Sequence, residues 1–156
     1  MAKTISGAAF RKMIMSGANY LEKNKEYVDS LNVFPVPDGD TGTNMNLTMQ
    51  SGAKEVQNRG DTGVYEVARA FSKGLLMGAR GNSGVILSQI FRGFSMAMEG
   101  KSEINVEDFA KAWDNGRAVA YKAVMRPVEG TVLTVIREAS TALMEKVGTM
   151  KTIEQA

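Results

Sequence analysis

The sequence predicts an all-α protein, and three observations lead to that prediction. Only three of its 156 residues are proline, and the long stretches between them carry apolar residues at the i, i+3, i+4 spacing of amphipathic helices. No segment of any length alternates apolar and polar residues as a half-buried strand does. Three polar connections rich in glycine or proline, residues 32–44, 78–84 and 126–131, separate the helical stretches. We therefore expect about seven helices, in a chain whose length is typical of one domain.

The first half of the chain predicts three helices. Apolar residues at positions 10, 13, 14 and 21 indicate a helix that starts after Ser6, a suitable N-cap. A short second helix is expected over residues 25–31, because Pro35 and Pro37 exclude a helix from the segment that follows. A third helix should begin at residues 41–43 and end near Gln57, before the turn sequence of residues 58–63.

The second half predicts four further helices, each indicated by its apolar face. They cover residues 65–77, 85–98, 106–125 and 131–147. The third of these has Glu107 and Asp108 in its first turn, where acidic side chains favour the helix dipole. Pro127 marks its end. The last six residues, 151–156, are expected to open another helix.

The composition excludes several kinds of active site. The chain has no cysteine and no histidine, which excludes disulfides, thiolate or imidazole metal sites, a cysteine nucleophile and Ser-His-Asp chemistry. Any metal must be held by oxygen and amide ligands, so Mg²⁺ is the natural candidate. The formal net charge is +2 without a basic run, so we expect no nucleic-acid partner. The sequence has neither an apolar run of transmembrane length nor a secretory signature, so we expect no transmembrane segment and a cytoplasmic protein.

Asp38-Gly39-Asp40, in the first polar connection, is open to two interpretations. Residues of these types form turns and cap helices. Carboxylates one residue apart can also bind one or two divalent cations. A calcium-binding EF-hand loop is excluded, because Gly42 and Met49 stand at its fifth and twelfth positions, where that loop needs oxygen ligands.

The segment that follows, residues 41–45, opens a predicted helix with small polar residues. Free N–H groups at a helix start attract anions, and small residues let a phosphate approach closely. Threonine and asparagine serve equally well as plain caps. Beside a pair of aspartates, a phosphate held through Mg²⁺ becomes the more attractive interpretation.

The second and third connections carry weaker signals. Residues 78–84 lack the Lys-Ser/Thr pair of a Walker loop, and no strand precedes them. Their glycines permit close helix packing or a second anion-binding helix start, with Asn82 and Ser83 as donors. Thr131 either caps the last helix or contacts a nucleotide. Arg80 and Arg126 either meet phosphate charge or are solvated surface charges.

Taken together, three motifs carry a family resemblance. NVFPVPDGDTGTNM (residues 32–45), GARGNSGVILSQIFRGF (78–94) and RPVEGTVLTV (126–135) occur in this order and resemble the nucleotide-binding domain of the dihydroxyacetone kinase superfamily. The first motif is most similar to the N-terminal, ATP-binding domain of bacterial fatty acid kinase. The resemblance covers nearly all of the chain. It implies a barrel of antiparallel amphipathic helices, eight in the complete domain, with nucleotide held by loops at one end.

Family members have a further C-terminal segment with an Asp-Gly-Gly or Asp-Pro-Gly motif near the nucleotide. The sequence ends at Ala156 without such a motif. The resemblance therefore implies that residues 1–156 are a single ATP- and Mg²⁺-binding domain, truncated at its C-terminus and belonging to the N-terminal part of a longer subunit.

The resemblance also implies the site residues. Asp38 and Asp40 would have the catalytic role, as ligands of two Mg²⁺ ions that bridge the phosphates of ATP or ADP, with Asn32 in place of a third family aspartate. The residues expected to contact the nucleotide are Thr41, Gly42, Thr43, Asn44, Gly81, Asn82, Ser83, Gly84, Thr131 and Leu133, the last two toward the base and ribose.

The implied reaction is phosphoryl transfer from ATP to a fatty acid carboxylate, presented by a separate fatty-acid-binding protein, to give an acyl phosphate. A carboxylate is ionised at neutral pH, so the reaction needs no general base, and the lack of histidine is no obstacle. Other domains of the subunit would recruit the partner. There are three alternatives to this function: a dihydroxyacetone kinase-type subunit, a non-catalytic nucleotide-binding regulatory module and a purely structural helical domain. The apolar helix faces suit ordinary core packing or, as in the superfamily, lipid binding.

Overall fold

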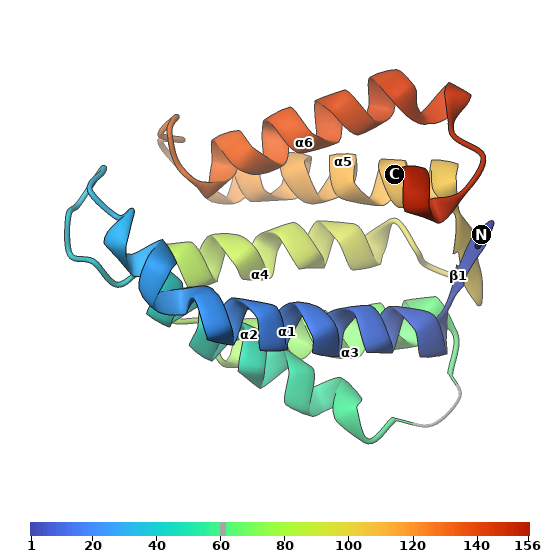
Figure 1. Ribbon diagram of the computed structural model, residues 1–156, viewed down its shortest axis with the longest axis horizontal. Coiled ribbons are helices and arrows are strands. Elements are labelled where there is room, and N and C mark those ends of the chain that lie inside the picture. Colours follow the sequence, from blue (N-terminus) through green and yellow to red (C-terminus); the bar gives the residue numbers. More distant parts are fainter. Residues whose placement is uncertain (60–61) are drawn as a thin grey trace.

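The computed structural model describes residues 1–59 and 62–156, and within them the protein is all-α apart from two very short strands (Figure 1). The predicted fold class is confirmed. The α-helices are α1 (Gly7–Ser30), α2 (Thr41–Gln57), α3 (Val64–Met77), α4 (Gly81–Met96), α5 (Val106–Ala123) and α6 (Val132–Lys146). The short elements are β1 (Thr4–Ser6), β2 (Glu103–Asn105) and the 3₁₀ turns η1 (Val147–Thr149) and η2 (Ile153–Gln155).

The predicted helix count is wrong by one, because α1 is a single helix of 24 residues. The two helices expected over residues 10–21 and 25–31 are its two halves. Residues 22–26 are all polar, which hides the apolar periodicity, but these residue types are compatible with a helix and neither glycine nor proline interrupts them. The start of α1 is as predicted, since the Ser6 side chain accepts a hydrogen bond from the amide of Ala9 at 3.1 Å.

Three other boundaries differ from the prediction. Helix α4 begins at Gly81, so most of the expected glycine-rich elbow is in fact its first turn. Helix α5 ends at Ala123, and Val124 is already extended. A proline follows a few residues later, and proline disfavours a helical conformation in the residue before it. The C-terminal residues form the 3₁₀ turns η1 and η2 in place of an opening α-helix.

The strand pair has no signal in the sequence, because three residues are too few to show alternation. Strands β1 and β2 are antiparallel, with Ile5 opposite Ile104. Both isoleucine side chains are buried. The pair joins the start of α1 to the start of α5, which has its own capping box between Asn105 and Asp108.

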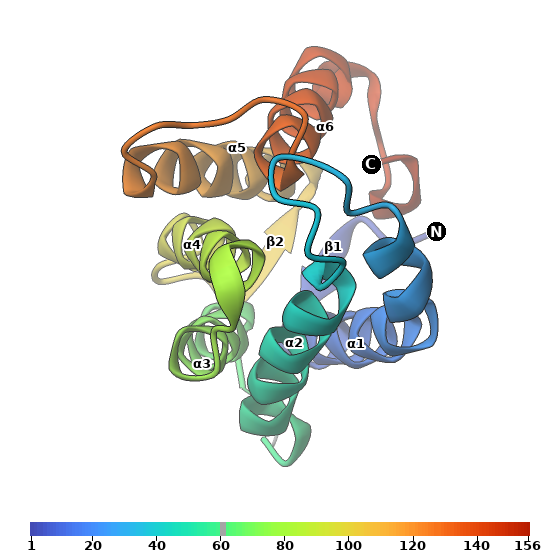
Figure 2. The ribbon, with the colours of Figure 1, turned by 90° about the vertical axis from the view of Figure 1, so that its left-hand side faces the viewer.

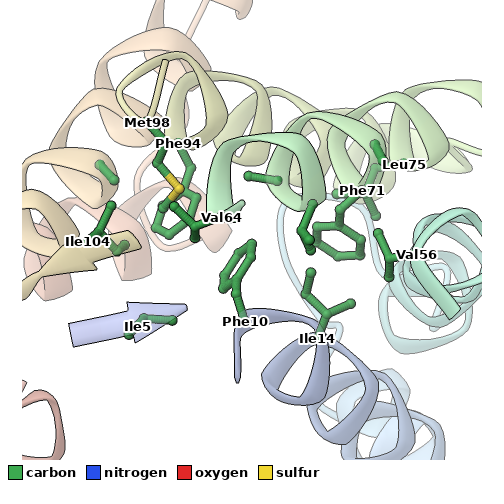
Figure 3. Close-up of a cluster of buried hydrophobic side chains, with 14 of the residues drawn as sticks. Ile5, Phe10, Ile14, Val56, Val64, Phe71, Leu75, Phe94, Met98 and Ile104 are labelled. Carbon is green, nitrogen blue, oxygen red and sulfur yellow. The ribbon is translucent and has the colours of Figure 1, made fainter. Parts of the chain in front are cut away.

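Aromatic rings form part of the core, and Figure 3 shows Phe10, Phe71 and Phe94 among aliphatic side chains. The rings of Phe10 and Phe94 stack with their centroids 5.6 Å apart. Phe94 also packs on Trp113 at 4.7 Å, and Phe91 meets the edge of Phe71 at 4.9 Å. Burial of each such ring contributes about 1.5–3 kcal/mol, so this cluster ties α1, α3, α4 and α5 together.

Glycine lets α2 and α3 approach each other closely. A Cβ atom at Gly52 of α2 would lie 2.6 Å from the ring of Phe71, and one at Gly74 of α3 would lie 2.8 Å from the Cα atom of Gly52. Real Cβ atoms do not tolerate such distances, so any side chain here would force the two helices apart. The α2–α3 spacing is therefore set by the absence of these two side chains.

The helices alternate in direction, and this places like connections together (Figures 1 and 2). The connections α1–α2, α3–α4 and α5–α6 lie at one end, which we call the loop end, whereas the strand pair and both termini lie at the other. Sequence neighbours pack side by side, but α1 and α6 do not close the ring in the described part of the chain. A groove of about 550 Å³ lies there, and its apolar lining includes Met13, Leu87, Phe91, Trp113, Val135 and Ile136. None of the described helices has the length and apolar character needed to cross a membrane.

Candidate functional site

The structure brings all three predicted loops to the loop end, as Figure 2 shows. The first and second loops meet where the side chain of Asn44 lies beside Gly81: a Cβ atom on this glycine would be 2.5 Å from Asn44 Nδ2. The first and third meet where the ring of Phe34 lies against Gly130, 3.6 Å from where its Cβ atom would be. The three motifs, far apart in sequence, therefore form one surface.

Asn32 organises the first loop. Its Oδ1 accepts hydrogen bonds from the amides of Asp40 and Thr41, at 3.1 and 3.2 Å, and from the Thr41 hydroxyl at 2.8 Å. Its Nδ2 donates to the carbonyl oxygen of Val36 at 2.9 Å. One carboxamide thus holds both the middle of the loop and the first residues of α2.

Asp29, in the last turn of α1, also holds the first turn of α2. Its Oδ1 accepts from the amide of Thr43 at 2.9 Å, and its Oδ2 accepts from the Thr43 hydroxyl at 2.6 Å. The hydrogen bond from this hydroxyl, together with those from the amides of Thr43 and Gly42, outweighs partial burial and lowers the pKa of Asp29 below its ordinary value. Asp29 is therefore ionised at neutral pH and neutralises the positive end of α2.

Asp38 and Asp40 do not cap α2, although they were candidates for that role. Asp40 is the residue before the helix, yet its side chain makes no capping hydrogen bond. Within residues 1–59 and 62–156, no hydrogen bond or ion pair engages either carboxylate. Gly39 between them has a φ of +64°, which lets the chain turn tightly there. Asp38 is exposed and Asp40 half-buried, so both carboxylates stay available to a ligand.

The geometry favours two of the three predicted metal ligands. Asn32 Oδ1 already accepts three hydrogen bonds, so binding a cation there would release the loop from its anchor. Asn32 therefore positions the loop in this structure, while the carboxylates of Asp38 and Asp40 are available as ligands. In the described part of the chain, no group of three acidic side chains could hold a metal ion. Two carboxylates are nevertheless enough for Mg²⁺, which is usually bound by one or two carboxylates, with phosphate and water as the remaining ligands.

The start of α4 contrasts with that of α2. Here the buried Thr48 of α2 fixes the helix start: its hydroxyl accepts from the amide of Arg80 at 3.0 Å and donates to the carbonyl oxygen of Asn44 at 2.8 Å. The side chain of Arg80 does not cap the helix. Among the described residues, no acceptor receives the amides of residues 81–83. These N–H groups are the ones with which a helix start binds an anion.

The start of α6 is capped by Thr131, as one of the two interpretations predicts. The Thr131 hydroxyl oxygen accepts from the amide of Leu133 at 3.3 Å and donates to the carbonyl oxygen of Val128 at 2.7 Å. The side chain of Leu133 is 2% exposed and packs in the core with Ile90 and Ile136, so a nucleotide contact of this residue would have to come from its backbone. An apolar side chain next to a cap is drawn into the helix interface, where it gains more by burial than at an open loop.

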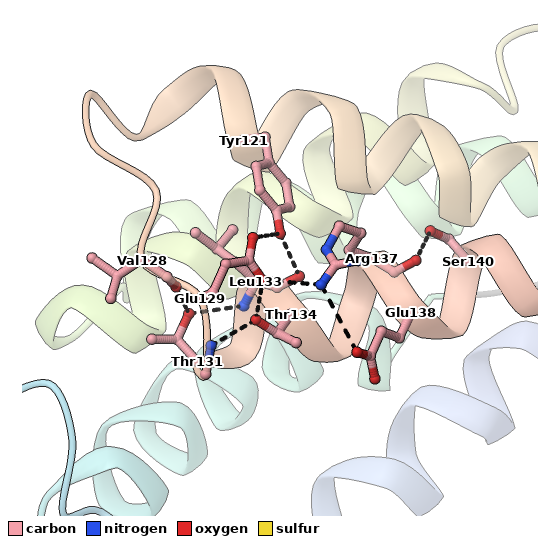
Figure 4. Close-up of polar contacts among 10 residues, drawn as sticks. Tyr121, Val128, Glu129, Thr131, Leu133, Thr134, Arg137, Glu138 and Ser140 are labelled. Carbon is pink, nitrogen blue, oxygen red and sulfur yellow. Dashed lines mark hydrogen bonds and ion pairs between the residues drawn. The ribbon is translucent and has the colours of Figure 1, made fainter.

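A polar network fixes the third loop (Figure 4). Glu129 accepts hydrogen bonds from the hydroxyl of Tyr121 at 3.0 Å, from Arg137 at 3.1 Å and from the hydroxyl of Thr134. These donors, that of Thr134 foremost, lower the pKa of Glu129. Burial, followed by the bond to Glu129, raises the pKa of Tyr121. The network anchors the loop to both α5 and α6 and so positions Gly130 next to Phe34.

Sequence reasoning missed Asp29, Thr48 and Glu129, which position the loops. Asp29 had a usable signal, because a carboxylate in the last turn of a helix opposes the helix dipole unless it serves another partner. Thr48 had a weaker signal: it is a threonine one helical turn after Asn44, on the same face of α2. Nothing in the local sequence marks Glu129, since its partners come from two different helices.

Comparisons with known proteins identify the family of this chain. Uncharacterized proteins of Staphylococcus epidermidis and of Staphylococcus aureus strain USA300 are each 58% identical to the chain, over 147 and 146 residues respectively. Each alignment covers 94% of this chain but 27% of the relative, so the chain spans about a quarter of the length of these proteins. The family model of the DAK2 domain matches residues 35–156, which include the second and third loops and the first loop from Pro35 onward. The chain belongs to the DAK2 domain family, which is associated with nucleotide-binding kinases.

Proposed function

We propose that this domain binds ATP together with Mg²⁺ at the loop end and serves phosphoryl transfer. The observation that carries the proposal is that, in and beside the first loop, one set of side chains holds the structure and another set is left free. Asn32 and Asp29 cap α2, which leaves the carboxylates of Asp38 and Asp40 without a structural task. Two free carboxylates on an anchored loop, beside a helix start with unused amides, suit a metal–triphosphate ligand.

Asp38 and Asp40 would hold Mg²⁺, with the nucleotide phosphates and water supplying the remaining ligands. When bound, the metal would neutralise charge on the β- and γ-phosphates. Two ions, as the family resemblance implies, would each need one of these carboxylates. Since both come from one loop fixed by Asn32, the chain holds them in place before the nucleotide arrives.

The phosphates themselves would lie at the start of α4. The amides of residues 81–83 point out of the helix end, and Gly81 has a φ of +60° that gives the backbone its approach to the ligand. Asn44 lies beside this glycine and would add a side-chain donor. Thr41 and Thr43 would contribute through the loop they stabilise, because their hydroxyls donate to Asn32 and Asp29. Thr131 would lie nearer the base and ribose.

The proposed acceptor is a fatty acid carboxylate brought by a separate fatty-acid-binding protein. Its support is the resemblance of residues 34–45 to the fatty acid kinase motif. An oxygen of the carboxylate would form a bond to the γ-phosphorus while the bond from that phosphorus to the β,γ-bridging oxygen breaks, and ADP would leave with the electron pair. No proton has to be removed from a carboxylate, which suits a chain without histidine.

Calorimetric titration of ATP into the protein, with and without Mg²⁺, tests the binding site. We expect Mg²⁺-dependent binding that is lost in Asp38→Asn/Asp40→Asn. A matched control, Glu22→Gln/Glu145→Gln, removes two exposed carboxylates from helices α1 and α6 and should bind as the wild type does. Circular dichroism establishes that every variant is folded. Equal affinity in the Asp38/Asp40 variant and the wild type would contradict the proposed site.

The acceptor needs its own assay. Protein supplied with ATP, Mg²⁺ and a lipid-loaded fatty-acid-binding protein should release ADP and form an acyl phosphate, which hydroxylamine traps as a hydroxamate. Binding of ATP without any ADP release in the full-length protein would favour a non-catalytic regulatory module over a kinase domain.

A further inference from the structure

A second surface, separate from the loop end, lies on the outer face of α3 and α4. There a groove of about 610 Å³ runs between the two helices. Arg69 and Lys73 of α3 and Arg92 of α4 line it, and all three side chains are exposed. We propose that this groove, which we call the basic groove, is the docking site of an acidic amphipathic helix from a partner protein.

The floor of the basic groove is made of small side chains. Ala70 and Ser72 of α3 and Ser88 and Ser95 of α4 are all buried there. The hydroxyls of Ser88 and Ser95 donate to carbonyl oxygens of their own helix, at 2.6 and 2.9 Å, so their donor capacity is already used. Small side chains let another helix approach closely, and the hydroxyls of Ser88 and Ser95 would not need a partner from that helix.

The charges of the groove explain why its occupant should be acidic. Arg69 and Lys73 are four residues apart and share one face of α3. Across residues 1–59 and 62–156, no ion pair satisfies either of them or Arg92. Like charges at this spacing repel one another, so carboxylates placed between them would relieve the repulsion as well as form new pairs.

Two further features favour a protein helix over a nucleic acid or a lipid surface. Leu76 and Met96, both more than half exposed, line the same groove and offer apolar area for a partner to bury. Glu66 and Glu99 also line it, and they would repel a uniform array of phosphates. A helix with a carboxylate-rich middle, apolar residues on the same side and a basic end matches all of these groups.

Because this proposal involves no nucleotide, it stands apart from the proposed function. Leu76 is at the end of α3 that leads into the second loop, so a partner docked in the basic groove would reach toward the loop end. The groove is therefore placed to hold a protein that works together with the nucleotide site.

Fluorescence anisotropy tests the proposal with a labelled helical peptide of 18 residues that carries Glu at i, i+4 positions, Leu on the same face and Lys at one end. We expect saturable binding that weakens at higher salt. Arg69→Glu/Lys73→Glu/Arg92→Glu should weaken it by roughly tenfold or more. The milder Arg69→Gln/Lys73→Gln/Arg92→Gln should have a smaller effect in the same direction.

The control is Lys12→Glu/Lys23→Glu/Lys54→Glu, which reverses three exposed charges on α1 and α2 and should change affinity less than about twofold. In addition, a peptide with Lys in place of Glu should prefer the charge-reversed groove variant to the wild type. Equal losses in the groove and control variants, or tighter binding of anionic phospholipid vesicles or an 18-nucleotide single strand through the same three residues, would overturn the proposal.

Discussion

Helices α2 and α4 both start at the loop end with short polar residues, but the two starts are built differently. The first amides of α2 are taken by Asn32 and Asp29, two side chains from the segment before it. The first amides of α4 have no acceptor in the described part of the chain, and only the residue before the helix is fixed, by Thr48. One start is closed by the protein itself, while the other is open to an anion.

The difference shows how a protein separates positioning from binding within similar sequences. At α2 the protein's own carboxylate neutralises the helix dipole, so a phosphate would meet a site already filled. This leaves the aspartates of the loop for a cation. At α4 the dipole has no such compensation, so a phosphate gains the full interaction. Substitutions at the two starts should therefore have opposite consequences for stability and for binding.

The largest effect is expected from Gly42→Ala at the closed start. A Cβ atom there would lie 2.0 Å from the carbonyl oxygen of Lys25, a backbone atom that cannot move without shifting α1. We expect the free energy of unfolding to fall by about 3 kcal/mol, measured by urea denaturation with circular dichroism. Gly148→Ala, where no atom lies within 4 Å, is the control and should change little. A neutral Gly42→Ala would show that the closed start is loosely packed.

Asp29→Ala should come next, with a loss of about 1–2 kcal/mol, the usual cost of removing a helix cap. Asp40→Ala is the comparison, because Asp40 makes no capping hydrogen bond, and it should cost less than about 0.5 kcal/mol. If the two substitutions destabilise the protein equally, the assignment of the cap to Asp29 is wrong.

The same residue gives a pH dependence with a definite sign. The folded state lowers the pKa of Asp29 below its ordinary value of 3.8, so its ionised form stabilises the fold above that pH. This contribution should disappear as the pH falls below 3.8 through the lower pKa of the folded state. The stability difference between the wild type and Asp29→Asn, followed from pH 6 to pH 2, should therefore shrink on acidification; a difference that grows would contradict the assignment.

Gly81→Ala at the open start should cost about 1 kcal/mol in stability, because the φ of +60° disfavours any residue with a side chain. The added methyl group would meet Nδ2 of Asn44, the end of a side chain that can turn away. Its main effect should be on binding, since the backbone amides that approach the phosphates would be displaced. Calorimetry of Mg²⁺-ATP should therefore show a larger loss than urea denaturation does.

The smallest effect on stability is expected for Asn82→Ala/Ser83→Ala, less than about 0.5 kcal/mol, since neither side chain caps the helix or is buried. Binding of Mg²⁺-ATP should nevertheless weaken measurably. A variant that binds as tightly as the wild type would leave the backbone amides as the sole contacts of this helix start.

Much of this arrangement could be predicted from the sequence, and the failures share a physical cause. Helix faces and loop positions come from local periodicity and from proline and glycine, so the all-α fold and its three loops were accessible. The cap of α2 was accessible only in part: the place of Asp29 in the last turn of α1 indicates that it serves another partner, but that partner, Thr43, lies 14 residues further along the chain. The burial of the Leu133 side chain was not predicted for the same reason, since it depends on α4, far away in the sequence. The interactions of a residue within its own helix can be predicted from the local sequence, whereas its contacts with other helices cannot.

The strand pair has a consequence for the order in which the chain assembles. Helix neighbours in sequence are neighbours in space, so their hairpins close short loops and form early. Pairing Ile5 with Ile104 closes a loop of roughly 100 residues, and its loss of chain entropy is larger, although this loss grows only slowly with loop length. During synthesis, β1 leaves the ribosome long before β2 exists, so β1 stays unpaired until β2 has been made. Strand β1 is thus made long before its partner and is among the last elements of this domain to find its place.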